Sequence, residues 1–191
     1  MGAADQTTLS TKSIWIIDDA IVEPLSEFGD SEMTSGERPT DRGTLLSLVR
    51  SDKWNSEPPV KALIQQLINS TGSIWAFPQP VAAIDHLQKG CPIPDIIIYD
   101  LGYNNLPTGA NVVAYLDSIL SACVSVVQVY TNRSVEEASR LLELLLQKYH
   151  MRLEKPKQKA DTTAEGLEKS LAERLEKSLS ASLAGEVRRL S

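Results

Sequence analysis

The sequence predicts an α/β fold built on a doubly wound, five-stranded parallel sheet with helices on both faces. The first observation is a set of short apolar runs, rich in β-branched or aromatic residues and bounded by polar or turn residues. Four runs predict buried strands and a weaker fifth ends before Pro156; they span 13–17, 74–77, 95–99, 124–130 and 151–154. The second observation is that segments with helical apolar spacing lie between these runs. Strands that alternate with helices indicate a parallel sheet covered on both faces.

Four segments between the strands predict helices, at 60–70, 81–88, 110–120 and 135–148. Pro80 precedes the second and suits a first helical turn. Ser134 precedes the fourth as N-cap, and Glu136 and Glu137 lie in its first turn, where carboxylates complement the helix dipole. For five strands the common arrangement is the flavodoxin-like order 2-1-3-4-5. Its ligand crevice lies at the carboxyl ends of strands 1 and 3.

Two stretches exceed a minimal five-strand fold. Residues 23–59 are rich in Glu, Ser, Gly, Pro and Asp and predict an insertion with one short helix at 44–54; loops this long are usually functional or disordered. The tail, 157–191, carries an eight-residue near-repeat with an apolar residue every four positions from Leu167 to Val187, which predicts a long amphipathic helix. We therefore expect an N-terminal extension at 1–12, a domain at 13–156 and a helical extension at 157–191.

Composition limits the classes of function. The net charge of −6 argues against a nucleic-acid-binding surface over the whole protein. The sequence contains no run of about 18 apolar residues, so we expect no membrane span. No apolar stretch follows a basic start, so we also expect no signal peptide. Cys91 and Cys123 have no metal-ligand spacing. A reduced, cytoplasmic setting is therefore expected, without nucleic acid or membrane as partner.

Carboxylate, hydroxyl and ammonium side chains, which can take part in catalysis or metal binding, directly follow the predicted strands. Asp18 and Asp19 follow the first strand, Asp100 the third, Thr131 the fourth and Lys155 the fifth. Because the carboxyl ends of parallel strands share one edge of the sheet, we expect these groups to converge. Clustered carboxylates repel one another unless a cation compensates, and Mg²⁺ prefers oxygen ligands. A carboxylate in such a site can attack phosphorus, while a metal and an ammonium neutralise the transferred oxygens.

The strand-end motifs resemble the signature strands of the response-regulator receiver family. They are WIIDDA at 15–20, DIIIYDL at 95–101, VYT at 129–131 and LEKP at 153–156. The resemblance implies that Asp100 is the phosphoacceptor. It also implies that Mg²⁺ is held by Asp18, Asp19, Asp100 and the backbone carbonyl of Gly102.

The same resemblance assigns roles on the fourth and fifth strands. Thr131 would be the switch hydroxyl and Lys155 the phosphate-contacting ammonium, with Pro156 following through a cis peptide bond. Family members usually carry an aromatic switch residue three positions before this lysine, and here that position is Arg152. The resemblance covers about 13–156, interrupted by the insertion.

The resemblance implies a phosphoacceptor domain of two-component signal transduction rather than an enzyme. A histidine kinase or phosphotransfer protein would donate the phosphoryl group, and a downstream protein would receive the signal through contacts with the tail or the insertion; a homodimer is a further option. Two alternatives stay open. One is a receiver-like interaction module that is never phosphorylated, suggested by Arg152 and the unusual loop after Asp100. The other is a Mg²⁺-dependent phosphohydrolase, although such enzymes need Asp-x-Asp and Ala20 interrupts that pattern.

Overall fold

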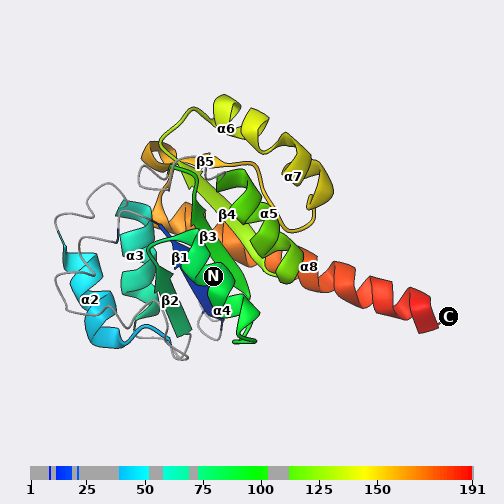
Figure 1. Cartoon of the computed structure of the whole chain (residues 1–191), viewed down its shortest axis with the longest axis horizontal. Helices are drawn as coiled ribbons and strands as arrows, with labels where there is room; N and C mark the ends of the chain where they lie inside the picture. Colours follow the sequence, from blue (N-terminus) through cyan, green and yellow to red (C-terminus); the bar gives the residue numbers. More distant parts are fainter. Residues whose placement is uncertain are drawn as a thin grey trace, which may run out of the picture.

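A computed structural model describes residues 9, 12–18, 21, 39–51, 58–68, 73–102 and 112–190 of the 191-residue chain. Its five strands form one parallel sheet in the order β2-β1-β3-β4-β5 (Figure 1). They are β1 (Ser13–Ile17), β2 (Ser73–Phe77), β3 (Ile96–Asp100), β4 (Val126–Thr131) and β5 (Lys157–Gln158). This confirms the predicted doubly wound, flavodoxin-like arrangement.

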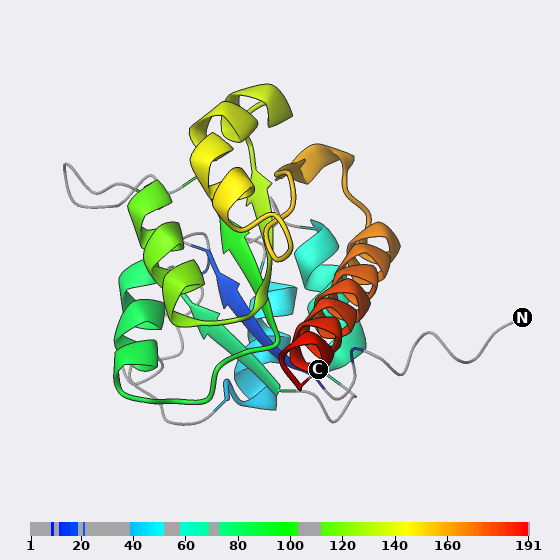
Figure 2. The same ribbon diagram turned by 90° about the vertical axis from the view of Figure 1, so that its right-hand side faces the viewer.

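Helices cover both faces of the sheet (Figure 2). One face packs against α2 (Arg42–Arg50), α3 (Pro58–Leu67) and α8 (Ala164–Leu190). The other face packs against α4 (Pro80–Gln88), α5 (Val112–Ala122), α6 (Val135–Leu141) and α7 (Glu143–Lys148). Alternation along each strand divides the core: Ile16 belongs to the α3–α8 side and Trp15 to the α4–α5 side. Strands β1 to β4 are mostly apolar because both of their faces are buried.

Part of the predicted insertion belongs to the core. Leu45 and Leu48 of α2 are buried with the α3–α8 side of the sheet. The segment before α2 protects the outer edge of β2, where the Thr40 amide donates to the Ile74 carbonyl and the Ala76 amide donates to the Thr40 hydroxyl. These bonds satisfy backbone groups that an edge strand would otherwise expose.

The other expectations for this region differ in detail. The predicted helix 44–54 begins and ends earlier, as α2, and the remainder of the insertion, 23–38 and 52–57, lies outside the described residues. The predicted helix 135–148 is divided into α6 and α7 at Leu142, whose backbone leaves the helical region with φ −99° and ψ 5°. Ser134 caps α6 as expected, since its hydroxyl accepts from the Glu137 amide.

The fifth strand is displaced along the chain from its predicted place. Leu153 makes a single parallel bridge with Val127, and the paired residues of β5 come later, where Lys157 lies opposite Tyr130. Between these two pairings the chain advances four residues, from Leu153 to Lys157, whereas β4 advances three, from Val127 to Tyr130. The segment that leads into β5 therefore contains one extra residue. Pro156 lies in this bulge, a position that tolerates a residue without an N–H.

The domain therefore continues past the expected boundary at residue 156. Leu167, Leu171 and Leu175 of α8 are at most 5% exposed and complete the core between α3 and the sheet. The C-terminal part of α8 extends past the sheet (Figure 1). Within the described part of the chain, no helix combines the length and apolarity that crossing a membrane requires.

Candidate functional site

Asp100 ends β3 at the carboxyl edge of the sheet. Its residue is 5% exposed, and it shares the α3–α8 face of β3 with Ile98. The Gly102 amide donates to Asp100 Oδ1 at 2.8 Å. A Cβ atom at residue 102 would lie 3.3 Å from the same oxygen, so a larger residue here would require the carboxylate or the backbone to shift by a few tenths of an ångström.

Lys159 supplies the cation for this carboxylate. Its Nζ lies 2.9 Å from Asp100 Oδ2, and the two side chains are 4% and 5% exposed. Lys159 follows β5 directly and begins a short 3-10 turn, η4 (Lys159–Asp161). A buried carboxylate needs such a partner because a lone charge in the interior is strongly unfavourable.

The lysine at the site is therefore Lys159, and the expectation for Lys155 is corrected. Lys155 is exposed and borders an open groove with residues of α6 and α7, including Glu136 and Arg140. The reason is the displaced fifth strand: its carboxyl end comes after Gln158, so the residue that reaches the shared edge is the next one. The only sequence signal for Lys159 was that two further lysines, Lys157 and Lys159, follow the LEKP motif closely.

Asp18 lies at the same edge of the sheet. It follows β1, is 4% exposed, and its amide donates to the Phe77 carbonyl. The last paired residues of β1 and β3 are Ile17 and Tyr99, so Asp18 and Asp100 are the next residues of two neighbouring strands. Strand alternation places both on the α3–α8 face of the sheet.

The second acidic residue of the predicted pair, Asp19, lies outside the described residues. In the described ranges, no group of three or more His, Cys, Asp and Glu side chains could hold a metal. Asp18 and Asp100 nevertheless provide carboxylate oxygens from adjacent strand ends, which is the ligand type that Mg²⁺ takes in proteins. The donor chemistry therefore fits Mg²⁺, with Asp19 and the Gly102 carbonyl as the further ligands that the resemblance implies.

Thr131 ends β4 at this edge and is fully buried. It is one residue past Tyr130, which lies opposite Asp100, and it pairs with Gln158 on the other side. Its hydroxyl oxygen accepts from the Arg133 amide at 3.0 Å, which leaves the hydroxyl hydrogen able to donate to a different acceptor. Thr131 thus occupies the strand end between the strands that carry Asp100 and Lys159.

Arg152 has a structural role away from this edge. Its guanidinium donates to the carbonyls of Leu120, at 3.0 Å, and Cys123, and lies 5.1 Å from the centre of the Tyr149 ring. These contacts satisfy carbonyls at the C-terminus of α5, which have no helical partner. Arg152 is therefore a helix cap in the place where the family pattern has an aromatic residue.

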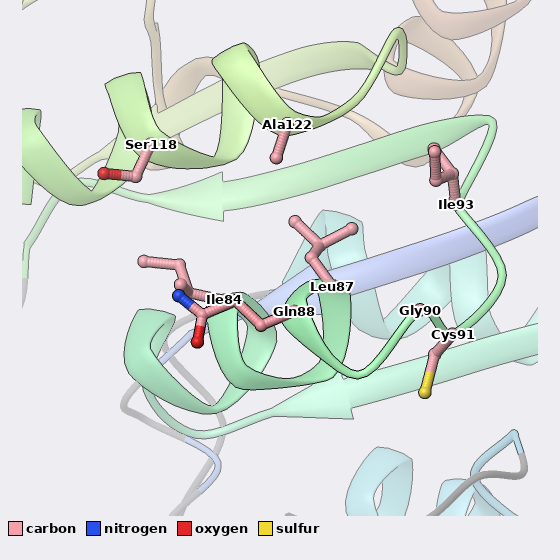
Figure 3. A pocket seen from close by; sticks show the side chains of 8 residues that line it. All are labelled: Ile84, Leu87, Gln88, Gly90, Cys91, Ile93, Ser118 and Ala122. Atoms are coloured by element: carbon pink, nitrogen blue, oxygen red, sulfur yellow. The ribbon is translucent and has the colours of Figure 1, made fainter.

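An apolar hollow of about 370 Å³ lies between α4 and α5 (Figure 3). Leu87 and Ile93 contribute to it, and Cys91 stands at its edge. Among the described residues, its lining contains no charged side chain. The segment before β3 borders it, at the amino end of the strand, whereas Asp100 lies at the carboxyl end. The hollow is therefore separate from the acidic site.

Comparisons with known proteins report on the fold alone. No protein-family model matches the chain, and no curated protein matches it. One solved structure is a fusion of amino acids 181–211 of the yeast Spc42 trimeric coiled coil to another structure. It is 15% identical, with a TM-score of 0.50, over 94% of this chain and 82% of that chain. At this identity the likeness supports a shared chain path and says nothing about chemistry.

Proposed function

We propose that the chain is a receiver domain that accepts a phosphoryl group on Asp100. The observation that carries the proposal is the buried contact between Asp100 Oδ2 and Lys159 Nζ at the edge where β1 and β4 also end. The ends of the neighbouring strands β1 and β4 add a second carboxylate, Asp18, and a hydroxyl, Thr131, and these are the group types that phosphoryl transfer to Asp uses.

The proposed reaction assigns a task to each side chain. One oxygen of Asp100 attacks the phosphorus of a phosphohistidine; the P–O bond forms as the P–N bond breaks, and the imidazole nitrogen keeps the electron pair. Bound Mg²⁺ supplies additional neutralisation of the phosphoryl oxygens. Lys159 leaves Oδ2 and donates to a transferred oxygen, and Thr131 donates its hydroxyl hydrogen to another.

The donor in this proposal is a histidine kinase or a phosphotransfer protein, in the cytoplasm. The added negative charge changes the contacts of Lys159 and Thr131, and a change in local contacts can alter a protein-binding surface. Output would then reach a downstream protein or a second copy of the chain.

The test is labelling by a small phosphoryl donor, acetyl phosphate, with Mg²⁺. We expect intact mass to increase by one phosphoryl group in the wild type and in Asp161→Asn, whose carboxylate is exposed close to Lys159. Asp100→Asn should remain unlabelled because it lacks the nucleophilic oxygen. Equal labelling of Asp100→Asn would reject the site.

A second candidate function is a receiver-like interaction module that is not phosphorylated. It is favoured by the contacts of Asp100, because Gly102 N–H binds one oxygen and Lys159 the other. Buried Trp15 on β1 provides a fluorescence probe close to Asp18. A saturable Mg²⁺ response that disappears in Asp100→Asn supports the phosphoacceptor; no response, together with no labelling, supports the interaction module.

A further inference from the structure

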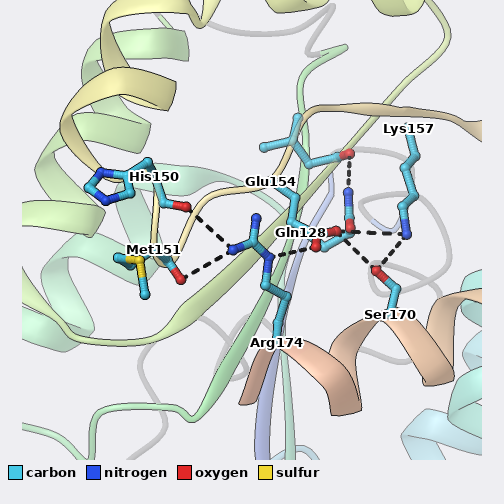
Figure 4. A network of polar contacts seen from close by, with 8 residues as sticks. Gln128, His150, Met151, Glu154, Lys157, Ser170 and Arg174 are labelled. Carbon is cyan, nitrogen blue, oxygen red and sulfur yellow. Dashed lines mark hydrogen bonds and ion pairs between the residues drawn. The ribbon is translucent and has the colours of Figure 1, made fainter. Parts of the chain in front are cut away.

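A polar network joins α8 to the segment that leads into β5 (Figure 4). Arg174 Nε donates to Glu154 Oε1 at 2.5 Å, and Ser170 Oγ donates to Glu154 Oε2 at 3.0 Å. Lys157 Nζ donates to Ser170 Oγ at 2.6 Å and lies 3.9 Å from Glu154 Oε2. The network therefore connects one face of α8 to the residues on both sides of the bulge at Pro156.

Arg174 also holds the backbone at the start of this segment. Its Nη1 donates to the carbonyls of His150, at 3.3 Å, and Met151, at 3.4 Å. Its side chain is 19% exposed and that of Glu154 is 24% exposed, so solvent screens the pair only in part. Every hydrogen bond described for Arg174 outside α8 is made with residues 150–154.

The segment needs this support because its pairing with β4 is sparse. Beyond Leu153, only Lys157 and Gln158 lie opposite β4 residues. Pro156 has no N–H to donate. The buried Gln128 side chain instead donates its Nε2–H to the Val129 carbonyl at 3.0 Å. Backbone hydrogen bonds alone therefore hold this stretch weakly, immediately before Lys159.

The charges that act on Lys157 come from both α8 and the segment before β5. Burial lowers the pKa of Lys157, Glu154 and Glu173 oppose that shift, and Arg174 adds to it. Lys157 is two residues before Lys159, so the contact that fixes Lys157 on α8 also fixes the start of the turn that carries Lys159 to Asp100.

We propose that Arg174 is a positioning residue for the phosphoacceptor: through Glu154 it holds the β5 segment on α8 and thereby keeps the Lys159 ammonium on Asp100. The inference rests on the proposed function. By linkage, a partner that displaces α8 loosens Lys159, and a change of charge at Asp100 loosens α8 by the same free energy. The partner whose binding would depend on the charge at Asp100 is therefore a protein that binds α8.

The variant Arg174→Gln removes the ion pair and keeps a polar side chain. Its matched control is Arg140→Gln, which removes an i,i+4 pair between Arg140 and Glu136 that is 77% exposed at both side chains. The first readout is the ¹⁵N signal of the Lys159 ammonium together with amide hydrogen exchange at Gln158 and Lys159. We expect the ammonium signal of Arg174→Gln to move toward that of a solvated lysine, with amide exchange faster by about tenfold.

Amides in β3 serve as the internal reference. A purely structural effect of Arg174→Gln would raise exchange at Ile98 and Gln158 in equal proportion, and that result would overturn the proposal, as would an unchanged Lys159 signal. Glu154→Gln should act in the same direction, and the double variant should lose less than the sum of the two single effects, because the Arg174–Glu154 contact is counted in both.

The second readout is the rate at which acetyl phosphate labels Asp100. We expect labelling about tenfold slower in Arg174→Gln and unchanged in Arg140→Gln. If the wild type is not labelled, the proposed function fails while the Lys159 signal still decides the positioning role. If the wild type is labelled and Arg174→Gln is labelled equally fast, the positioning role fails alone.

Discussion

Lys159 Nζ lies 2.9 Å from Asp100 Oδ2 although 59 residues separate them, and both side chains are almost completely buried. Two charges in such a place stabilise the fold only as a pair. Removal of one leaves the other desolvated and uncompensated, which is far more costly than replacement of both by apolar residues.

We predict that Lys159→Met destabilises the protein by about 3–5 kcal/mol at neutral pH. Urea unfolding measures the effect. The matched control, Lys155→Met, should change the free energy of unfolding by less than about 0.5 kcal/mol, because Lys155 is exposed. The double variant Lys159→Met/Asp100→Leu should recover most of the loss. An equally large loss in the Lys155 variant would contradict the assignment of the lysine.

Arg152→Met should destabilise the protein by about 1.5–3 kcal/mol, because it leaves the Leu120 and Cys123 carbonyls at the end of α5 without their charged donor. Thermal or urea unfolding provides the measurement. Labelling of Asp100 and any Mg²⁺ response should be unchanged, since Arg152 caps a helix away from the acidic edge. A loss of labelling without a loss of stability would indicate a switch role instead.

Gln128→Met should cost about 1–3 kcal/mol because the buried Val129 carbonyl loses its side-chain donor. The bulge at Pro156 suggests a specific rescue. Pro156→Ala supplies a backbone N–H on the facing segment, so it should recover part of the loss in the Gln128→Met background. Pro156→Ala in the wild type, where Gln128 already donates, is the control and should stabilise less.

His86 predicts a pH dependence of stability. It is 3% exposed, lies among Trp15, Trp75 and Phe77, and its Nε2 finds no hydrogen-bond partner in the part of the chain that the structure describes. Burial, and then the charge of Lys89, lower the pKa of His86 below 6.5. Below pH 6.5, His86 of the unfolded chain therefore binds a proton, whereas His86 of the folded chain stays neutral until the pH reaches its lowered pKa.

The stabilising contribution of neutral His86 is complete above pH 6.5 and declines as the pH falls from 6.5 toward the lowered folded pKa. The decline is about 1.4 kcal/mol for each unit between the two pKa values. Urea unfolding between pH 7.5 and about pH 5 measures it. His86→Phe should reduce the slope over this range, whereas His150→Gln, at an exposed position, should leave it unchanged.

Local patterns were sufficient for most of the fold. The β-branched runs that became β1, β3 and β4 are mostly apolar because both of their faces are covered, and their alternation with helical segments indicated a parallel sheet. The same reasoning predicted that Asp18, Asp100 and Thr131 lie at the ends of their strands, since the position of a residue relative to a strand end depends on nearby sequence.

The sequence did not identify the cationic partner of Asp100. A sequence that contains Lys155, Lys157 and Lys159 does not say which ammonium reaches the third strand. That depends on the register of β5 against β4, on one extra residue at Pro156, and on the contacts of Arg174 with the preceding segment. The sequence by itself determined the sheet and its acidic edge, because those follow from local periodicity. Only the tertiary structure decided the lysine, because a single-residue shift in strand register is set by packing against distant parts of the chain.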